Sequence, residues 1–448
     1  MKYEYPKIAD INPDTGMSVR SLEWEYFVEY ARMKYEQGAD KADIQKIIDE
    51  VEAVVKTASK KLIALQDDEA LARLEPNDLP SIKAQRPCAK RILWDTLDEK
   101  TYQDKLSASI FGRFAGCLLG APVEFWSIQE MKEWAAYNGQ DFPPNRYWLK
   151  TPHPHWLRYE VSRYFEYEEA NINGVPVDDD ITYPVLCTLL MQEKGHKFDT
   201  TDAGEIWKKY LPRACTAEEV VLFHLWKDVD ANQAAELDNP YQQFIGAGIR
   251  ADAFGWAAPG RPEKAAEMAY HDAFLTHRRN GIYGEMYYAA VIAAGFTTND
   301  MRTALEAGLV EIPQGSLLAQ DVRWVLETAD SVKDYLTARK VTQSHFGQMS
   351  GVHINFNVAL TLFGLLIDEN DFTRVISEVT AMGFDNDCNA ATAGSIFGAV
   401  KGLASIPEYW YGLFNDTVYT YLNGMPKMGI SDMAKRLSDV AKSIFGDE

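Results

Sequence analysis

Cysteine is scarce in this sequence, with five residues among 448, widely spaced and without a CxxC pair. This scarcity argues against a disulfide framework and favours a reducing compartment. The sequence also lacks any run close to the ~20 apolar residues of a membrane span, and residues 1–12 are polar, unlike a secretory signal. We therefore expect a soluble, cytoplasmic protein.

Positive charge is also in deficit. Lys and Arg number 45 against 66 Asp and Glu, which gives a formal net charge of −21. A nucleic-acid backbone or an anionic membrane surface would be repelled, so neither is expected as a partner. A small anionic ligand is not excluded, because a bound cation would offset its charge.

Several common catalytic signatures are missing. The sequence contains no HExxH, no GxSxG and no P-loop, and its eight histidines show no zinc-type spacing with cysteine. No histidine-based motif therefore competes with the acidic clusters described below.

The first hundred residues predict a helical extension. Apolar residues recur at helical spacing in 24–31 and again in 44–63, with charged residues between them. Residues 67–87 are polar and contain three prolines, which is typical of a linker. We expect residues 1–100 to carry no catalytic chemistry.

Residues 101–448 have a different texture, in which small and apolar residues mix at helical period and few segments alternate with period two. This pattern predicts a mainly α-helical domain. A stretch rich in Trp, Tyr and Pro, at about 127–173, predicts an insertion between helices. The clearest helical segments are 106–119, 183–191, 284–296, 356–366, 390–403 and 430–445.

The first segment with chemical potential is a glycine series. Gly112, Gly116 and Gly120 are four residues apart and share one helical face, so another helix or a ligand could approach the backbone closely. Each glycine costs the helix roughly 1 kcal/mol against alanine, so a compensating contact is expected. Pro122 predicts the helix end and places Glu124 in the loop that follows.

Two acidic clusters lie far apart in the sequence, each before a helix of small or apolar residues. The first is Asp178–Asp180, with Pro184 expected in the first turn of its helix. The second contains Asp385, Asp387 and Cys388. Either cluster alone is weak evidence, since an N-cap aspartate or an ordinary loop explains it. If the two helices pack side by side, however, the carboxylates converge, and bound Mg²⁺ is the simplest way to balance them.

The three segments, in this order, resemble the ADP-ribosylglycohydrolase family. The glycines and Glu124 match its GxxxGDALGxxxE-like opening, Asp178–Asp180 match a [ST]DDT-like metal motif, and 383–388 match a GxDxD[ST] motif. The stretch 244–252, which contains Arg250, is similar to an N-G-x-x-M-R-like stretch of the family. The resemblance covers roughly residues 102–405.

The resemblance implies an all-α fold, a compact multi-helix orthogonal bundle over 101–448 with the helical extension at 1–100. It implies hydrolysis of a glycosidic bond to ADP-ribose, or a related riboside, that is free or linked to a protein, with two Mg²⁺ ions or Mn²⁺ in their place. The implied catalytic residues are Glu124, Asp179 and Asp387, the implied substrate-binding residues are Gly120 and Arg250, and the implied metal ligands are Asp178, Asp179, Asp180, Asp385, Asp387 and Cys388.

The sequence departs from the family pattern at several of these positions. Cys117 replaces the Asp of GDALG, Asp178 and Ile181 replace the flanking hydroxyl residues of the first metal motif, and Cys388 replaces the last Ser or Thr. A thiol is a poor Mg²⁺ ligand. The departures indicate a divergent subgroup and leave two alternatives open: a metal-dependent hydrolase of another glycoside, or a silent relative that binds ADP-ribose or has a structural role.

Overall fold

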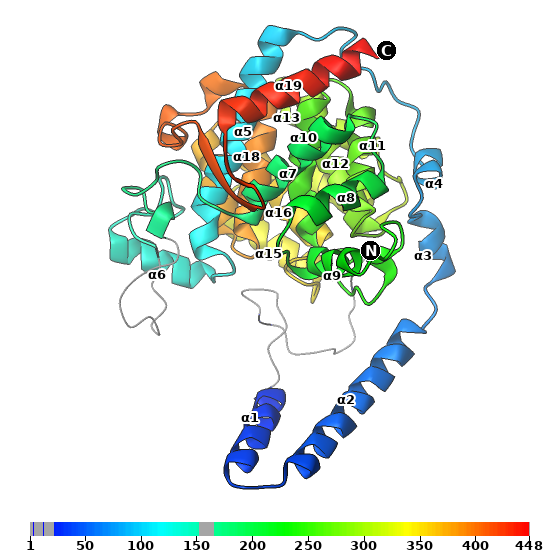
Figure 1. The fold of residues 1–448 in the computed structure, drawn as a ribbon. Helices are drawn as coiled ribbons and strands as arrows, with labels where there is room; N and C mark the ends of the chain where they lie inside the picture. The colour runs from blue at the N-terminus through cyan, green and yellow to red at the C-terminus, as the bar shows by residue number, and fades with distance from the viewer. Residues whose placement is uncertain (1–2, 4–11, 13–21, 152–164, 448) are drawn as a thin grey trace.

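The computed structural model describes residues 3, 12, 22–151 and 165–447 (Figure 1). The all-α prediction is confirmed, since helices dominate and the described residues contain one two-stranded sheet. The N-terminal helices are α1 (Leu22–Glu36), α2 (Lys41–Ile63), α3 (Glu69–Leu74) and α4 (Leu79–Ala84). The helices of the main body are α5 (Glu99–Gly120), α6 (Ile128–Asn138), α7 (Asp179–Lys194), α8 (Thr200–Tyr210), α9 (Thr216–Trp226), α10 (Ala251–Ala257), α11 (Pro262–Ala273), α12 (Asn280–Gly295), α13 (Met301–Leu309), α14 (Leu317–Thr328), α15 (Tyr335–Phe346), α16 (Ile354–Ile367), α17 (Phe372–Ala381), α18 (Asn386–Lys401) and α19 (Ile430–Gly446).

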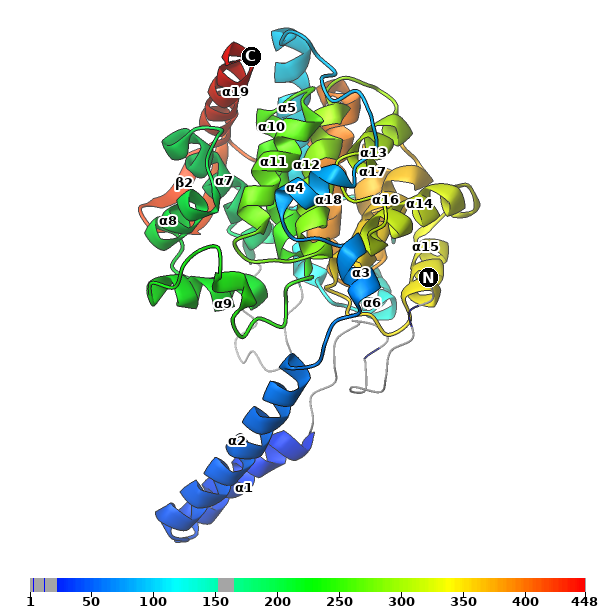
Figure 2. The same cartoon turned by 90° about the vertical axis from the view of Figure 1, so that its right-hand side faces the viewer.

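Helices α5 and α18 lie side by side at the centre of the body (Figures 1 and 2). Helices α7, α10, α12, α16 and α17 surround this pair, and α12 is buried along its whole length. The antiparallel hairpin of β1 (Thr417–Leu422) and β2 (Met425–Gly429) packs beside α7 and leads into α19. The C-terminal end of α5, which leads to Glu124, lies beside the start of α18, which carries Asp387.

The glycine series explains how close the two central helices come. A Cβ at Gly112 would lie 2.7 Å from the carbonyl carbon of Gly394, and one at Gly116 would lie 2.7 Å from the amide nitrogen of Ala391. One at Gly120 would lie 2.6 Å from the amide nitrogen of Asp387. The helix contact predicted from these glycines is therefore present, and backbone packs against backbone along the pair.

We expect the Gly116→Ala variant to lose about 1–3 kcal/mol of unfolding free energy, because its new methyl group would meet immovable backbone of α18. Urea unfolding would measure the loss. Gly446→Ala is the matched control, since a Cβ there meets nothing within 4 Å. Equal stabilities for the two variants would show that the central helices are not in contact at Gly116.

Helix α5 is the buried core helix of the protein. Together with the turn that follows it, Glu99–Val123, it is long and apolar enough to cross a membrane by length and composition. However, 89% of its most apolar window is buried inside the protein. Its apolarity is thus accounted for by burial among the surrounding helices.

The N-terminal part contains the two expected helices, α1 and α2, but the expected linker is wrong for much of its length. Residues after α2 form α3 and α4, which lie against the body. Glu75 is buried and pairs with Arg279 at 2.7 Å, and Ile82 belongs to the main core. The prolines start or flank short helices instead of marking a free tether.

The aromatic-rich stretch at about 127–173 contains α6 and irregular chain, and residues 152–164 of it lie outside the described residues. Its aromatic side chains are anchors. The indole of Trp148 donates to the carbonyl of Leu119 at 3.0 Å, and the hydroxyl of Tyr147 donates to the carbonyl of Trp410. This stretch therefore supports the C-terminal end of α5, next to Glu124.

Candidate active site

The first acidic cluster forms the start of α7. Asp178 is the N-cap, because its carboxylate accepts a hydrogen bond from the amide of Asp180 at 3.0 Å. Its other oxygen accepts from the hydroxyl of Tyr167 at 3.2 Å. Asp178 also belongs, with Asp179 and Asp180, to a group whose ligand atoms lie within 4.8 Å of one another, so its role as a metal ligand stays a prediction.

Pro184 lies inside α7 and not in its first turn, as the sequence had suggested. A proline within a helix leaves the carbonyl four residues earlier without its amide partner, here that of Asp180. The fully buried Arg113 of α5 replaces the missing donor, because its Nε donates to this carbonyl at 2.9 Å. Arg113 of α5 therefore replaces the backbone hydrogen bond that Pro184 removes from α7.

Asp180 is held by the same arginine. Arg113 Nη2 contacts Asp180 Oδ1 at 2.7 Å, and the Cys388 thiol donates to Asp180 Oδ2 at 2.9 Å. Asp180 was predicted to be a main metal ligand. Its position beside Asp387 and Cys388 is as expected, and its role as a metal ligand stays a prediction. Through these contacts it also joins α5, α7 and α18.

Glu124 and Asp385 each lie next to a phenylalanine with a strained backbone. Phe125 and Phe384 both have left-handed backbone, with φ of 59° and 61°, a conformation that costs a bulky residue energy and is concentrated at functional sites. The amide of Phe125 donates to the carbonyl of Phe384 at 2.9 Å. This bond joins the loop of Glu124 to the loop of Asp385.

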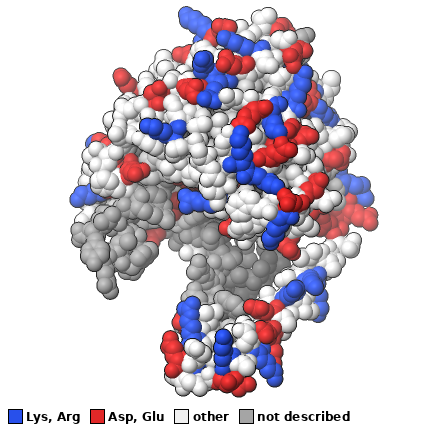
Figure 3. All heavy atoms as spheres, viewed as in Figure 1, with Lys and Arg blue, Asp and Glu red and all other residues white. Residues whose placement is uncertain are grey.

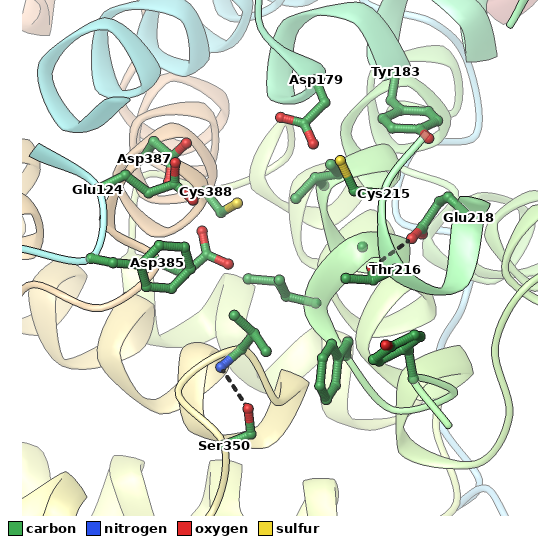
Figure 4. A pocket seen from close by; sticks show the side chains of 17 residues that line it. Glu124, Asp179, Tyr183, Cys215, Thr216, Glu218, Ser350, Asp385, Asp387 and Cys388 are labelled. Carbon is green, nitrogen blue, oxygen red and sulfur yellow. Dashed lines mark hydrogen bonds between the residues drawn. The ribbon is translucent and has the colours of Figure 1, made fainter. Parts of the chain in front are cut away.

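The two acidic clusters meet in space. Ligand atoms of Glu124, Asp385 and Asp387 lie within 4.8 Å of one another, and so do those of Asp180, Asp387 and Cys388. Asp179 points from α7 toward this group across a cavity (Figure 4). The convergence on which the sequence interpretation depended is therefore present.

The carboxylates line a cavity of about 630 Å³, a size typical of small-molecule sites. Glu124, Asp385 and Asp387 lie together on one side of it, and Asp179, Tyr183 and Glu218 lie across from them (Figure 4). The lining residues are Glu124, Phe125, Asp179, Tyr183, Cys215, Thr216, Glu218, Tyr241, Phe244, Ile245, Gly246, Ile249, Ser350, Val352, Asp385, Asp387 and Cys388.

Burial makes the acidic group electrostatically costly without a cation. It raises the pKa of Asp180 to about 7 and the pKa of Asp385 to about 6. Burial, together with the neighbouring carboxylates, holds the pKa of Asp178 and of Asp387 well above the usual range. A divalent cation would remove this cost by stabilising the ionised forms.

Two orphaned oxygens show where such a cation fits. Asp385 Oδ1 and Asp387 Oδ1 are buried and have no hydrogen-bond partner, although buried polar atoms are nearly always paired. Both residues line the cavity. Carboxylate oxygens are the ligands that Mg²⁺ prefers, so the residues present fit a hard divalent cation.

Cys388 does not have the character of a metal ligand. Burial raises the pKa of its thiol well above the usual value, so the sulfur stays protonated and donates to Asp180. A neutral thiol is a poor partner for Mg²⁺. In this structure the thiol orients Asp180, and the metal-ligand role of Cys388, whose sulfur lies within 4.8 Å of ligand oxygens of Asp180 and Asp387, stays a prediction.

Gly120 and Arg250 do not line the cavity, contrary to the substrate-binding roles expected for them. Gly120 lies against the backbone of Asp387 and sets the spacing of the two helix ends. Arg250 is fully buried, pairs with Glu218 at 2.6 Å, and forms a second ion pair with Asp272. Its guanidinium is occupied by protein carboxylates, which leaves it no reach toward a substrate phosphate.

Glu218 was missed by the sequence interpretation. It lies in the first turn of α9, lines the cavity and is held by Arg250 and by the hydroxyl of Thr216 at 3.3 Å. Glutamates in the first turn of a helix, here Glu218 and Glu219, are ordinary helix chemistry. The ion pair of Glu218 with Arg250, which lies in a separate segment of the chain, is the feature that distinguishes Glu218 from an ordinary first-turn glutamate.

A solved structure described as an "ADP-ribosylglycohydrolase-related protein complex" is 16% identical, with a TM-score of 0.46, and the match covers 77% of this chain and 99% of that chain. No curated protein matches. The sequence model of the ADP-ribosylglycohydrolase family matches residues 98–443, most of the chain and all of the acidic cavity. With this match, the chain belongs to the ADP-ribosylglycohydrolase family.

Proposed function

We propose that this protein is a magnesium-dependent hydrolase that cleaves the glycosidic bond between ADP-ribose and an acceptor. Membership of a glycohydrolase family supports the reaction class. The observation that carries the proposal is the pair of orphaned, buried oxygens of Asp385 and Asp387 on the wall of the cavity. A cation bound to these two oxygens would pair them, at the place where a substrate would enter the cavity.

Asp179, Asp385 and Asp387 would hold the metal, because all three line the cavity. When bound, Mg²⁺ would supply positive charge that orients ribose hydroxyls and lowers the pKa of a bound water. Asp178 and Asp180 would contribute indirectly, by fixing the helix start that presents Asp179.

The remaining lining residues suit a riboside. As the bond at the anomeric carbon breaks, that carbon gains positive charge, which the carboxylates around the cavity stabilise. The Glu124 carboxylate would accept the proton of the attacking water. Tyr241 and Phe244, whose ring centroids lie 5.2 Å apart, form an aromatic wall that can stack a purine base and exclude water.

The direct test is release of ADP-ribose from ADP-ribosylated peptides with the modification on arginine or on serine. We expect release with Mg²⁺, which EDTA abolishes and added Mg²⁺ restores. Hydrolysis of simple ribosides alone would favour the other glycoside-hydrolase assignment. Tight ADP-ribose binding without turnover, in the wild type and in Asp387→Ala alike, would contradict the proposal and favour a silent binding protein.

The effect of Mg²⁺ on thermal stability is expected to grow with pH. Raised pKa values mean that the metal-free folded protein binds protons more tightly than the unfolded chain, whose carboxyls titrate near 4. That stabilisation is present below about pH 4 and is lost as the pH rises through 6 and 7, the pKa values of Asp385 and Asp180. Mg²⁺ binds the ionised forms and therefore compensates most at high pH.

Differential scanning fluorimetry between pH 5 and 8, with and without Mg²⁺, would measure this effect. NaCl at matched ionic strength is the control for screening. We expect a small Mg²⁺-induced rise in Tm at pH 5 and the largest rise at pH 8. A rise that is equal at all pH values, or largest at pH 5, would contradict a cation bound beside the carboxyls of Asp385 and Asp180.

A further inference from the structure

Glu218 and Tyr183 form a polar patch on the wall of the cavity that lies across from Asp385 (Figure 4). They come from separate elements, Glu218 from α9 and Tyr183 from α7. Glu218 is 3% exposed and Tyr183 is 2% exposed, and both line the cavity. Neither has a role in the reaction proposed above, so both can serve to bind another part of the substrate.

The hydroxyl of Tyr183 lacks a hydrogen bond. Its Oη is buried and has no partner among the described residues, although buried polar groups are nearly always paired. Tyr183 lies one turn after Asp179 on α7, so the two side chains share a helical face. Burial holds the pKa of Tyr183 well above its usual value, so the hydroxyl stays neutral and can both donate and accept. A ligand with hydroxyl groups would pair it.

The Glu218 carboxylate is fixed in place but keeps capacity for further hydrogen bonds. Its Oε1 accepts from Arg250 at 2.6 Å, and its Oε2 accepts from the hydroxyl of Thr216 at 3.3 Å. Thr216 has left-handed backbone, with φ of 46°, which is rare for a β-branched residue and concentrated at functional sites. An ionised carboxylate offers about four acceptor positions, so these two bonds do not exhaust it. It pairs with O–H or N–H donors of a ligand and repels a phosphate.

Gly246 connects the polar patch to the aromatic wall of the cavity. A Cβ at Gly246 would lie 2.6 Å from the carboxyl carbon of Glu218, so the backbone there packs directly against the carboxylate. Gly246 follows Phe244 by two residues, and Phe244 and Tyr241 are the residues proposed above to stack the purine base. Because a base and its ribose are directly bonded, a base on this wall would place its ribose next to Glu218.

The cavity offers no protein cation for a phosphate in this position. Lys and Arg side chains are present on the outer surface (Figure 3), but the described residues that line the cavity include no Lys, Arg or His. A phosphate next to Glu218 would therefore meet a like charge without compensation, and such a contact is a means of rejecting the wrong ligand.

We propose that Glu218 and Tyr183 bind the 2′- and 3′-hydroxyls of the ribose that carries the adenine, and thereby select ADP-ribose over its 2′-phosphorylated form. The inference rests on the proposed function, because it takes ADP-ribose as the substrate. A vicinal diol suits this patch, since one hydroxyl can donate to the carboxylate while the other pairs with the neutral tyrosine hydroxyl.

Calorimetric titration of the full chain with Mg²⁺ present tests the proposal, with free ADP-ribose, the analogue that lacks the adenosine 2′-hydroxyl, and 2′-phospho-ADP-ribose as ligands. For the wild type we expect both analogues to bind at least about 10-fold more weakly than ADP-ribose, because a hydrogen bond to a charged group is lost. Tyr183→Phe should bind ADP-ribose about 3-fold to 10-fold more weakly. Its Tm should be unchanged, because its hydroxyl has no partner in the protein to lose.

Glu218→Gln separates ligand recognition from folding. Glutamine keeps an oxygen for Arg250 but removes the charge that repels the phosphate. We expect ADP-ribose to bind about 10-fold more weakly, and its advantage over 2′-phospho-ADP-ribose to shrink. A purely structural defect would weaken both ligands alike and leave their ratio unchanged. Glu219→Gln, an exposed neighbour in the same turn, is the matched control and should bind like the wild type.

Equal wild-type affinity for ADP-ribose and for the analogue without the 2′-hydroxyl would overturn the proposal. Wild-type affinities in both Glu218→Gln and Tyr183→Phe would do so as well. Discrimination only against an analogue with hypoxanthine in place of adenine would assign the patch to the base and overturn the assignment to the ribose. Failure of the proposed function gives a different result, since a wild type that binds none of these ligands would overturn that function and this inference together.

Discussion

Replacing Asp387 by asparagine is expected to lower kcat more than about 100-fold, because loss even of an outer partner of a metal site typically costs 10–100-fold. Asp387 is proposed to contact the metal directly, so its loss should cost more than the loss of an outer partner. It belongs to both acidic groups that meet at the cavity, and one of its oxygens is buried without a partner. Asparagine keeps the shape but removes the negative charge that a cation requires.

The same substitution should not unfold the protein. The pKa of Asp387 is held well above its usual range by burial and by Glu124 and Asp385, so removal of its charge relieves repulsion in the metal-free protein. We expect a Tm without Mg²⁺ equal to or above that of the wild type. Asp439→Asn, an exposed carboxylate of α19, is the control. Wild-type kcat in Asp387→Asn would remove this residue from the reaction.

Replacing Arg250 by methionine is expected to lower the free energy of unfolding by about 3–5 kcal/mol, the cost of removing one partner from a buried ion pair. Arg250 is surrounded by Glu218, Asp272 and Glu285, all buried. Without the guanidinium these carboxyls must protonate or rearrange. Urea or thermal unfolding would measure the loss, which is a large share of a typical domain stability.

Arg302→Met provides the matched control for Arg250. Arg302 is partly exposed, and its carboxylate partner Asp330 is almost fully exposed, so its loss should stay within about 0.5 kcal/mol. A phosphate-binding arginine would behave differently, with a raised KM and nearly unchanged stability. That outcome for Arg250→Met would contradict the structural role assigned here.

The parts of the site that could be predicted from sequence are those in which a local pattern carries the physical reason. Gly112, Gly116 and Gly120 lie on one helical face at a cost to helix stability, so a close neighbour was required, and α18 is that neighbour. Two acidic clusters before helices required a common counter-charge. The structure brings them together around Asp387.

The parts that could not be predicted depend on which charged groups meet across the fold. Arg250 was expected to bind substrate because the fork of its guanidinium suits phosphate oxygens, yet three carboxylates from other helices pair with it. The ion pair of Asp180 with Arg113 of α5 was not predicted from the sequence either. Local sequence patterns do not predict these ion-pair partners, because each pair joins residues far apart in the chain.

The segment before the main body was misjudged for a related reason. Polar, proline-containing sequence between residues 67 and 87 is typical of a tether, but the polar groups there find buried partners. Arg86 pairs with Glu311, which is fully buried, and Glu75 pairs with Arg279. The composition of a segment indicates how it behaves in water. It does not show which charged residues of the main body will pair with it in the folded protein.

The most direct test of the central claim is anomalous diffraction from a crystal soaked in Mn²⁺, whose position can be located independently of the protein atoms. We predict a peak bordered by the carboxylates of Asp385 and Asp387, on the side that faces Asp179. A data set with no peak in that cavity, or with peaks only on the outer surface, would contradict the account.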